Sequence, residues 1–351
     1  MVAFLRPRAA RQLASRWAKL GTTVVATLLV AGCSDPEPSE GEGSLDGVLR
    51  VNQLQAKATH NSYHIAPADP NLGAWQYTHA PMDEQLGAQG VRAFELDTQY
   101  NATDDRFECV HLPGLDEGTR CRVFTDCLVA MKSWSDQNPR HHLLFLQIEP
   151  KDVPPADDPE PYFARLEQEI LSVWPRTSIV TPDDVRGPAA TLREAVVSTG
   201  WPTLGATRGK LLLFVDNSSE FRAAYTRGGS DLNGRLMFID SDVDSPFAGV
   251  LILNDPGAEV SDAVNLGFVV RTRADADVRE PLAGETSRRD AALASGAQIV
   301  STDFPVPTAN IDYSVEIPGG TPSRCNPLVA PPACRSKHIE NPSRLGSLET
   351  H

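Results

Sequence analysis

Residues 91–97 read Val-Arg-Ala-Phe-Glu-Leu-Asp, an apolar run that ends in two acids. The run over 91–96 is typical of a buried strand. Side chains alternate along a strand with a period of two residues, so Glu95 and Asp97 share one face. In a parallel barrel both carboxylates would point into the opening at the carboxyl end of the strand. The stretch therefore predicts a buried strand with a pair of acids at its end.

Similar apolar runs recur along the chain, with helical periodicity between several of them, at 161–173 and 289–295. Apolar strands that alternate with helices indicate a parallel sheet covered on both faces. No Gly-rich phosphate loop follows them, so we expect an α/β fold of the (β/α)8 TIM-barrel type, regular or distorted. The runs at 235–239 and 250–253 compete for one barrel position, and this choice stays open. The runs are 53–59, 91–96, 107–111, 142–148, 210–215, 235–239, 250–253, 267–271 and 297–302.

Polar side chains stand at or just beyond the ends of four runs. Chemistry in TIM barrels lies at the carboxyl ends of the strands, so these side chains should meet at one opening, here called the mouth. Solvated strand-end charges are the ordinary alternative for a single Glu-x-Asp pair, but four clusters in succession favour a site. The clusters contain His60 with Asn61, Glu95 with Asp97, His111, and Glu149.

The first 33 residues have the pattern of an export signal. Five basic residues lie between positions 6 and 19, and an apolar stretch follows at 20–32. This stretch is shorter than the roughly 20 residues that cross a bilayer core, which favours a secretory signal. Residues 29–33 (Leu-Val-Ala-Gly-Cys) resemble the cleavage site of bacterial lipoproteins. We expect export with a lipid on Cys33 and anchoring in the cell envelope. Ordinary cleavage with a free Cys33, and secretion, is the alternative.

Composition divides the rest of the chain and limits its partners. Residues 34–47 are predicted to form a disordered acidic tether, 48–315 one barrel domain, and 316–351 a Pro-rich extension. Removal of residues 1–32 takes away five basic and no acidic residues, which changes the formal net charge from −14 to −19. A chain this acidic lacks the basic surface that binds nucleic acid. Its bulk charge would not attract it to anionic membranes either.

Six cysteines suit an oxidising compartment. With Cys33 set aside, five remain. Their short spacings favour the pairs Cys121–Cys127 and Cys325–Cys334, the second of which would staple the C-terminal extension. Cys109 is then expected to be free and buried in a strand.

Taken together, these clusters resemble a known family. They look like the catalytic elements of phosphatidylinositol-specific phospholipase C, and most closely like those of its calcium-dependent bacterial branch. The resemblance runs through most of the barrel domain. It is carried by the motifs at 57–64 (Lys-Ala-Thr-His-Asn-Ser-Tyr-His), 94–97 (Phe-Glu-Leu-Asp), 110–111, 148–149, 271–275, 296–303 and 324–327.

The resemblance implies a phosphodiesterase that uses one calcium ion. It implies catalytic roles for His60 and His111. Hard carboxylate and amide oxygens suit calcium, and no thiolate or His-rich spacing suggests zinc. The calcium ligands that the resemblance implies are Asn61, Glu95, Asp97 and Glu149.

The implied substrate is phosphatidylinositol at a membrane surface. The inositol 2-hydroxyl would attack phosphorus, diacylglycerol would leave, and a cyclic inositol phosphate would form, which water can later open. His111 is the candidate acid for the leaving glycerol oxygen, because an imidazole titrates near neutral pH. His60 is placed on a phosphoryl oxygen. The base is Glu95 or Asp97, and the sequence leaves this choice open.

Three basic residues near the expected mouth are candidate substrate contacts. Lys151 could meet phosphate or remain a solvated loop lysine. Arg271 and Arg273 share a face at the end of the seventh barrel strand and could bind phosphate or the inositol ring. The alternative is that one of the two arginines forms a structural ion pair with Asp275 or Asp303.

The remaining histidines are expected to lie away from the chemistry. His64 and His79 are predicted to be surface residues on a loop. His141 and His142 precede the fourth strand and should lie at the closed end of the barrel. Asp116 follows His111 by five residues and could orient it, but the intervening Pro-Gly turn leaves its direction open.

Two rival functions remain. A glycerophosphodiester phosphodiesterase uses a similar barrel with paired histidines and a Glu-x-Asp metal site. That family typically has Arg-Gly after its first histidine, where this chain has Asn61 and Ser62. The second rival is a surface lipoprotein that keeps the barrel as a binding module without turnover. Retention of both histidines and all four ligand positions argues against it.

Overall fold

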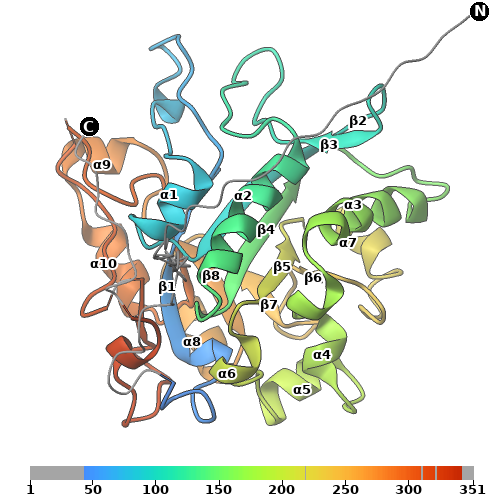
Figure 1. Cartoon of the computed structure of the whole chain (residues 1–351), viewed down its shortest axis with the longest axis vertical. Helices are drawn as coiled ribbons and strands as arrows, with labels where there is room; N and C mark the ends of the chain where they lie inside the picture. Colours follow the sequence, from blue (N-terminus) through green and yellow to red (C-terminus); the bar gives the residue numbers. More distant parts are fainter. Residues whose placement is uncertain (1–42, 218, 310, 321, 342–351) are drawn as a thin grey trace, which may run out of the picture. The chain divides into compact units, whose positions relative to one another are not determined.

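Eight parallel strands form the wall of a near-closed barrel in the computed structural model of the chain (Figure 1). The structure describes residues 43–217, 219–309, 311–320 and 322–341. The strands follow the order β6-β5-β4-β2-β1-β9-β8-β7, which confirms the predicted α/β barrel. The wall strands are β1 (Leu54–Thr59), β2 (Ala93–Asn101), β4 (Leu144–Pro150), β5 (Leu211–Val215), β6 (Phe238–Ile239), β7 (Val250–Ile252), β8 (Val269–Arg273) and β9 (Ile299–Thr302).

The wall strands are buried on both faces because helices cover the outside of the barrel. Every residue of β5 is buried, as a continuous apolar run predicts. In α3, the buried residues Tyr162, Phe163, Leu166 and Ile170 recur at helical spacing. The helices are α1 (Met82–Gly87), α2 (Phe124–Gln137), α3 (Glu160–Val173), α4 (Pro182–Arg186), α5 (Leu192–Ser198), α6 (Leu204–Thr207), α7 (Glu220–Tyr225), α8 (Ala258–Leu266), α9 (Arg279–Ala283) and α10 (Ser287–Ala294).

The run at 107–111 is not a wall strand, which corrects the sequence prediction. Its first part forms β3 (Arg106–Glu108), which pairs antiparallel with the end of β2. The reason is the length of β2: its nine residues extend past the wall, and the exposed backbone of the overhang takes a hairpin partner. Figure 1 shows this hairpin beyond the upper end of the barrel.

With that position vacated, both competing runs become wall strands. β6 and β7 stand at the two ends of the strand order. No backbone ladder between them is recorded among the described residues. Instead, the backbone N–H of Ile252 donates to the Asp240 carboxylate at 2.8 Å. The barrel is therefore distorted at one seam, where a side chain replaces part of a ladder.

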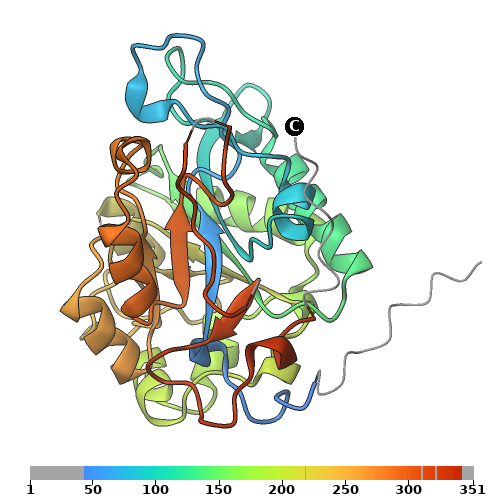
Figure 2. The same ribbon diagram turned by 90° about the vertical axis from the view of Figure 1, so that its left-hand side faces the viewer.

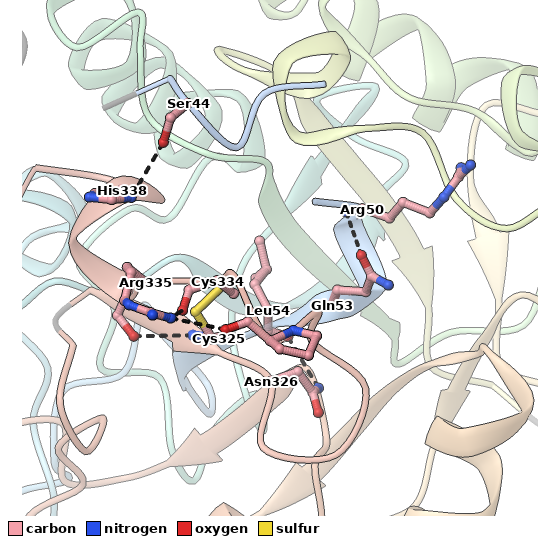
Figure 3. Close-up of a disulfide and its surroundings, with 11 residues drawn as sticks. Ser44, Arg50, Gln53, Leu54, Cys325, Asn326, Cys334, Arg335 and His338 are labelled. Carbon is pink, nitrogen blue, oxygen red and sulfur yellow. Dashed lines mark hydrogen bonds between the residues drawn. A yellow bond between two sulfur atoms is a disulfide. The ribbon is translucent and has the colours of Figure 1, made fainter. Parts of the chain in front are cut away.

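The C-terminal extension packs along β1. The strand β10 (Ser323–Cys325) pairs antiparallel with β1, and Figure 2 shows it against the lower part of β1, with β9 beside it. A disulfide joins Cys325 to Cys334 (Figure 3). Asn326 donates to the carbonyl oxygen of Gly296 at 2.7 Å. These bonds hold the extension against the barrel.

The other cysteines follow the pairing that their spacing favoured. Cys121 and Cys127 form a disulfide, and Cys109 is free and buried. Cys109 lies directly after β3 rather than inside a strand.

The N-terminal predictions fall largely outside the described residues. The export signal, Cys33 and residues 34–42 of the predicted tether are not among them. In the described part of the tether, Leu45 is buried and Asp46 accepts a hydrogen bond from Arg208 at 2.8 Å. Within the described ranges, no helix combines the length and apolar character needed to cross a bilayer.

A buried ion pair fastens the end of the described chain to the barrel. Arg92 donates to both carboxylate oxygens of Glu340 and lies 4.7 Å from the centre of the Trp134 ring. The backbone N–H of His142 also donates to Glu340, at 3.2 Å. Burial alone would raise the pKa of Glu340, but the charge of Arg92 lowers it to about 2. Burial lowers the pKa of His142 to about 3.

We predict that Glu340→Gln lowers the free energy of unfolding by about 3 to 5 kcal/mol at pH 7, because it leaves the buried Arg92 without its counter-ion. Chemical denaturation monitored by circular dichroism measures this. The folded-state pKa of Glu340 lies below its ordinary value of 4.5, so its stabilising effect is complete above pH 4.5 and is lost as the pH falls toward 2. The difference between the two proteins should therefore shrink over that window.

The exposed pair Lys132–Asp136 is a suitable control. Asp136→Asn should change the free energy of unfolding by about 0.5 kcal/mol or less, because water screens a surface pair. An equal loss of unfolding free energy in both variants would show that the buried pair stabilises the fold no more than a surface pair does.

Candidate active site

The mouth of the barrel contains a cluster of three carboxylates. The parallel register sets Asp97 of β2 opposite Glu149 of β4, and Glu95 shares the face of Asp97 because side chains alternate. One oxygen from each of the three residues lies within 4.8 Å of the others. We call Glu95, Asp97 and Glu149 the acidic cluster. The structure thus brings together three of the four predicted metal ligands.

The fourth predicted ligand, Asn61, follows β1 in a left-handed conformation (φ 43°), which asparagine tolerates better than most residues. Its amide nitrogen donates to the Tyr77 hydroxyl at 3.1 Å. Its Oδ1 atom is buried and has no hydrogen-bond partner among the described residues, and the same holds for Oδ1 of Asp97. Buried oxygens rarely stay unpaired. Two such atoms beside an acidic cluster fit a site for a hard cation such as calcium.

Two basic side chains partly neutralise the acidic cluster. The Lys151 ammonium lies 2.5 Å from Glu149 and 2.9 Å from Asp97. Arg271 donates to Glu95 at 2.6 Å. Burial alone would raise the pKa of Glu95, but Arg271 and His60 lower it below its usual range. Burial and the charge of Glu149 raise the pKa of Asp97 well above its usual range, against the effect of Lys151.

His60 lies beside the acidic cluster, and its ring is held by a hydrogen bond on the nitrogen that faces away from Glu95. Its Nδ1 is 2.7 Å from Asp303, and its Nε2 is 3.7 Å from Glu95. Arg273 donates to Asp303 at 3.1 Å and so fixes the carboxylate that fixes the imidazole. Burial alone would raise the pKa of Asp303, but Arg273 and His60 lower it far below its usual range. The ion pair that the sequence left as an alternative for Arg273 is therefore present.

His111 has the same arrangement on a different loop. Its Nδ1 lies 2.8 Å from Asp116, which answers the question of where the Asp116 side chain points. The ring of Trp75 packs nearly perpendicular to the imidazole, with 5.2 Å between the ring centres. Burial lowers the pKa of His111, and the hydrogen bond to Asp116 partly offsets this effect. Among the described residues, no hydrogen bond to the Nε2 of His111 is recorded.

The surface prediction for His64 and His79 was wrong, because both side chains are buried. His64 bonds to Asp116 at 2.9 Å and to the Tyr77 carbonyl at 3.0 Å. His79 lies 2.8 Å from the carbonyl oxygen of His60, and burial lowers its pKa to about 4. The sequence prediction failed because these imidazoles bond to backbone carbonyl oxygens and to Asp116 instead of to water.

Three residues near the mouth escaped the sequence analysis. Tyr77 contacts Asn61 through its hydroxyl and lacks any sequence signal. Asp216 and Asp240 directly follow β5 and β6, so the strand-end rule that identified Glu95 would also have found them. Burial and the charge of Glu95 raise the pKa of Asp216 to about 7, and burial raises that of Asp240 to about 6.

Comparison with protein families gives one match. The model for the calcium-dependent phosphoinositide phospholipase C family matches residues 98–327. This span contains His111 and Glu149 but begins one residue after Asp97. The clusters at 60–61 and 95–97 therefore lie outside the match, and only their place in the same barrel connects them with the family.

Solved structures with the same fold include two phospholipases C. A calcium-dependent phosphoinositol-specific phospholipase C from a Gram-negative Pseudomonas species is 18% identical, with a TM-score of 0.57, over 83% of this chain and 100% of that one. A calcium-dependent phosphatidylinositol-specific phospholipase C from Streptomyces antibioticus is 18% identical, with a TM-score of 0.53, over 73% of this chain and 95% of that one. At this identity the likeness bears on the fold alone.

The comparison with curated proteins gave no match. The family model nevertheless covers well over half of the chain, and the barrel and its acidic cluster agree with it. The chain belongs to the calcium-dependent phosphoinositide phospholipase C family.

Proposed function

We propose that the chain cleaves phosphatidylinositol between glycerol and phosphate, with release of diacylglycerol and a cyclic inositol phosphate. One observation carries this proposal: two imidazoles, each bonded through Nδ1 to a buried carboxylate, accompany an acidic cluster at the mouth of a barrel. Acid–base groups beside a cation site are what an attack of a hydroxyl on a phosphodiester needs.

A single calcium ion is proposed to be held by Asn61 and the acidic cluster. The unpaired Oδ1 atoms of Asn61 and Asp97 support this assignment. When bound, the ion would lower the pKa of the attacking hydroxyl and neutralise charge on the phosphoryl group. The hydroxyl proton is proposed to pass to Glu95 or Asp97, the two carboxylates at the end of β2.

His111 is proposed to protonate the leaving glycerol oxygen. Because Asp116 binds Nδ1, the proton in transfer would be carried by Nε2, the nitrogen for which the described residues supply no partner. His60 is proposed to donate from Nε2 to a phosphoryl oxygen. Asp303 holds the opposite nitrogen, so the ring keeps one orientation while charge develops on the phosphate.

The three basic residues that are candidate substrate contacts are proposed to act in different ways. The Lys151 ammonium is partly exposed at the acidic cluster, which suits direct contact with phosphate. Arg271 and Arg273 are mostly covered and bonded to acids. We propose that these arginines shape the site by holding Glu95 and Asp303.

The chain is further proposed to be exported and held at a membrane by a lipid on Cys33. The basic start, the short apolar stretch and the Leu-Val-Ala-Gly-Cys ending support this proposal. A lipid anchor would keep the barrel near its phospholipid substrate despite the net negative charge of the chain. Secretion without an anchor is the alternative outcome.

The protein should release water-soluble inositol phosphate from phosphatidylinositol micelles with calcium and not with chelator. His111→Ala should reduce the rate roughly 10²- to 10⁴-fold, because a general acid contributes that much. Phosphorus NMR of the released product measures both the calcium dependence and the rate of the variant. His338→Ala, at the C-terminal extension, is a control that should retain activity.

Two other outcomes would replace this proposal. Hydrolysis of glycerophosphodiesters with phosphatidylinositol left intact would favour a glycerophosphodiester phosphodiesterase. Ligand binding without turnover, unchanged in His60→Ala and His111→Ala, would indicate a binding module.

Calcium binding can be tested apart from activity. Isothermal titration calorimetry should give one site, and Asp97→Asn should weaken its affinity by roughly a hundredfold, because the charge of the ligands tunes calcium binding. Asp136→Asn removes an exposed charge of the same kind and should leave the affinity unchanged. Equal weakening in both variants, or a stoichiometry other than one, would contradict the proposed site.

The lipid anchor predicts that the full chain, expressed in a bacterial host, incorporates labelled palmitate and sediments with membranes. Cys33→Ala should lose the label, because the acceptor thiol is gone. A labelled Cys33→Ala protein would show that the lipid is not on Cys33, and an unlabelled parent found in the medium would support secretion without an anchor.

A further inference from the structure

A buried imidazole lies behind the Asp116–His111 pair. His64 is inaccessible to solvent, and its Nε2 lies 2.9 and 3.1 Å from the two oxygens of Asp116. Its Nδ1 lies 3.0 Å from the carbonyl oxygen of Tyr77. The Asp116 carboxylate therefore stands between two imidazoles, of which only that of His111 reaches the mouth.

The hydrogen bonds of His64 occupy both of its ring nitrogens. Both ring nitrogens face oxygens that can only accept, namely the Tyr77 carbonyl and the Asp116 carboxylate. A neutral imidazole has one N–H and would leave one of these contacts without a proton. An N–H group on each ring nitrogen would satisfy both contacts. The buried bond between His64 and Asp116 lies in direct contact with the imidazole of His111.

The same bond ties a weakly covered loop to the barrel. Leu112 and Leu115, on either side of the turn after His111, are exposed. Among the described residues, the recorded backbone hydrogen bonds of Asp116 stay within this turn and join it to Leu112. The side-chain contact with His64 links the turn to the segment that follows β1. Backbone bonds from Ile65 to Gly118 and from Arg120 to Tyr63 anchor the later part of the loop.

We propose that His64 is a positioning residue: held by Tyr77, it fixes the Asp116 carboxylate, and through that carboxylate it orients His111 and sets its affinity for a proton. The proposal rests on the acid role given to His111 under the proposed function. Because His64 is fully buried, it has no contact with substrate and acts through Asp116.

Three ionisable groups influence His111. Asp116 raises its pKa, whereas His64 and Lys151 lower it. Replacement of His64 by glutamine would keep a donor to Asp116 but remove the imidazole that lowers the pKa of His111. The pKa of His111 should therefore rise.

The test uses His64→Gln and His64→Phe in the full chain. The glutamine amide can still donate to Asp116, whereas phenylalanine keeps a ring against Tyr77, 4.4 Å away, and loses both bonds. NMR titration of the His111 ring, assigned with His111→Ala, should show its pKa raised by about one unit in His64→Gln. In His64→Phe, kcat should fall roughly 10- to 100-fold with KM nearly unchanged, by analogy with the outer partners of metal-bound imidazoles.

His141→Gln is the matched control, since His141 is also buried with both ring nitrogens bonded, but to Ser135 and His142 at the closed end of the barrel. It should leave the His111 titration and kcat unchanged. An unshifted His111 in His64→Gln, or equal kinetic losses in all three variants, would overturn the proposal. The NMR titration needs no turnover, so failure of the proposed function (no inositol phosphate from the parent protein) is seen separately from failure of the His64 coupling.

Discussion

The parallel pairing of β2 with β4 is the constraint on which the site depends. It aligns Asp97 with Glu149 and places Glu95 beside them on the same face. A slip of one residue would turn all of these side chains to the opposite face. The long apolar runs of both strands, buried against the helical layer, hold the register. The same packing that stabilises the barrel therefore concentrates negative charge at its mouth.

Such a concentration of buried charge is costly, and the chain offsets it with fixed cations. Arg271 pairs with Glu95, Lys151 with Asp97, and Arg273 with Asp303. Removing charges from water rarely stabilises a fold, so stability alone does not account for these pairs, and they fit the proposed site better. They also leave specific atoms unpaired, above all Oδ1 of Asp97. The basic side chains therefore do not fully neutralise the acidic cluster at the point where a cation would bind.

Next to the acidic cluster, loops supply two imidazoles, and each is bonded through Nδ1 to an aspartate. His60 bonds to Asp303 and His111 to Asp116, although the four residues come from separate parts of the chain. Tyr77 connects the two halves, since its hydroxyl contacts Asn61 and its carbonyl contacts His64. The loop that contains Trp75 and Tyr77 therefore contacts both imidazoles.

The sequence by itself determined the barrel class, the acidic cluster, both catalytic candidates and the short-range cysteine pairs, because strand periodicity and strand ends are local signals. Tertiary structure alone decided that 107–111 leaves the wall and that His64 and His79 are buried. It also decided which acid faces which base. Those outcomes depend on contacts between residues far apart in the chain, such as His60 with Asp303, and no local pattern encodes the direction in which a loop folds.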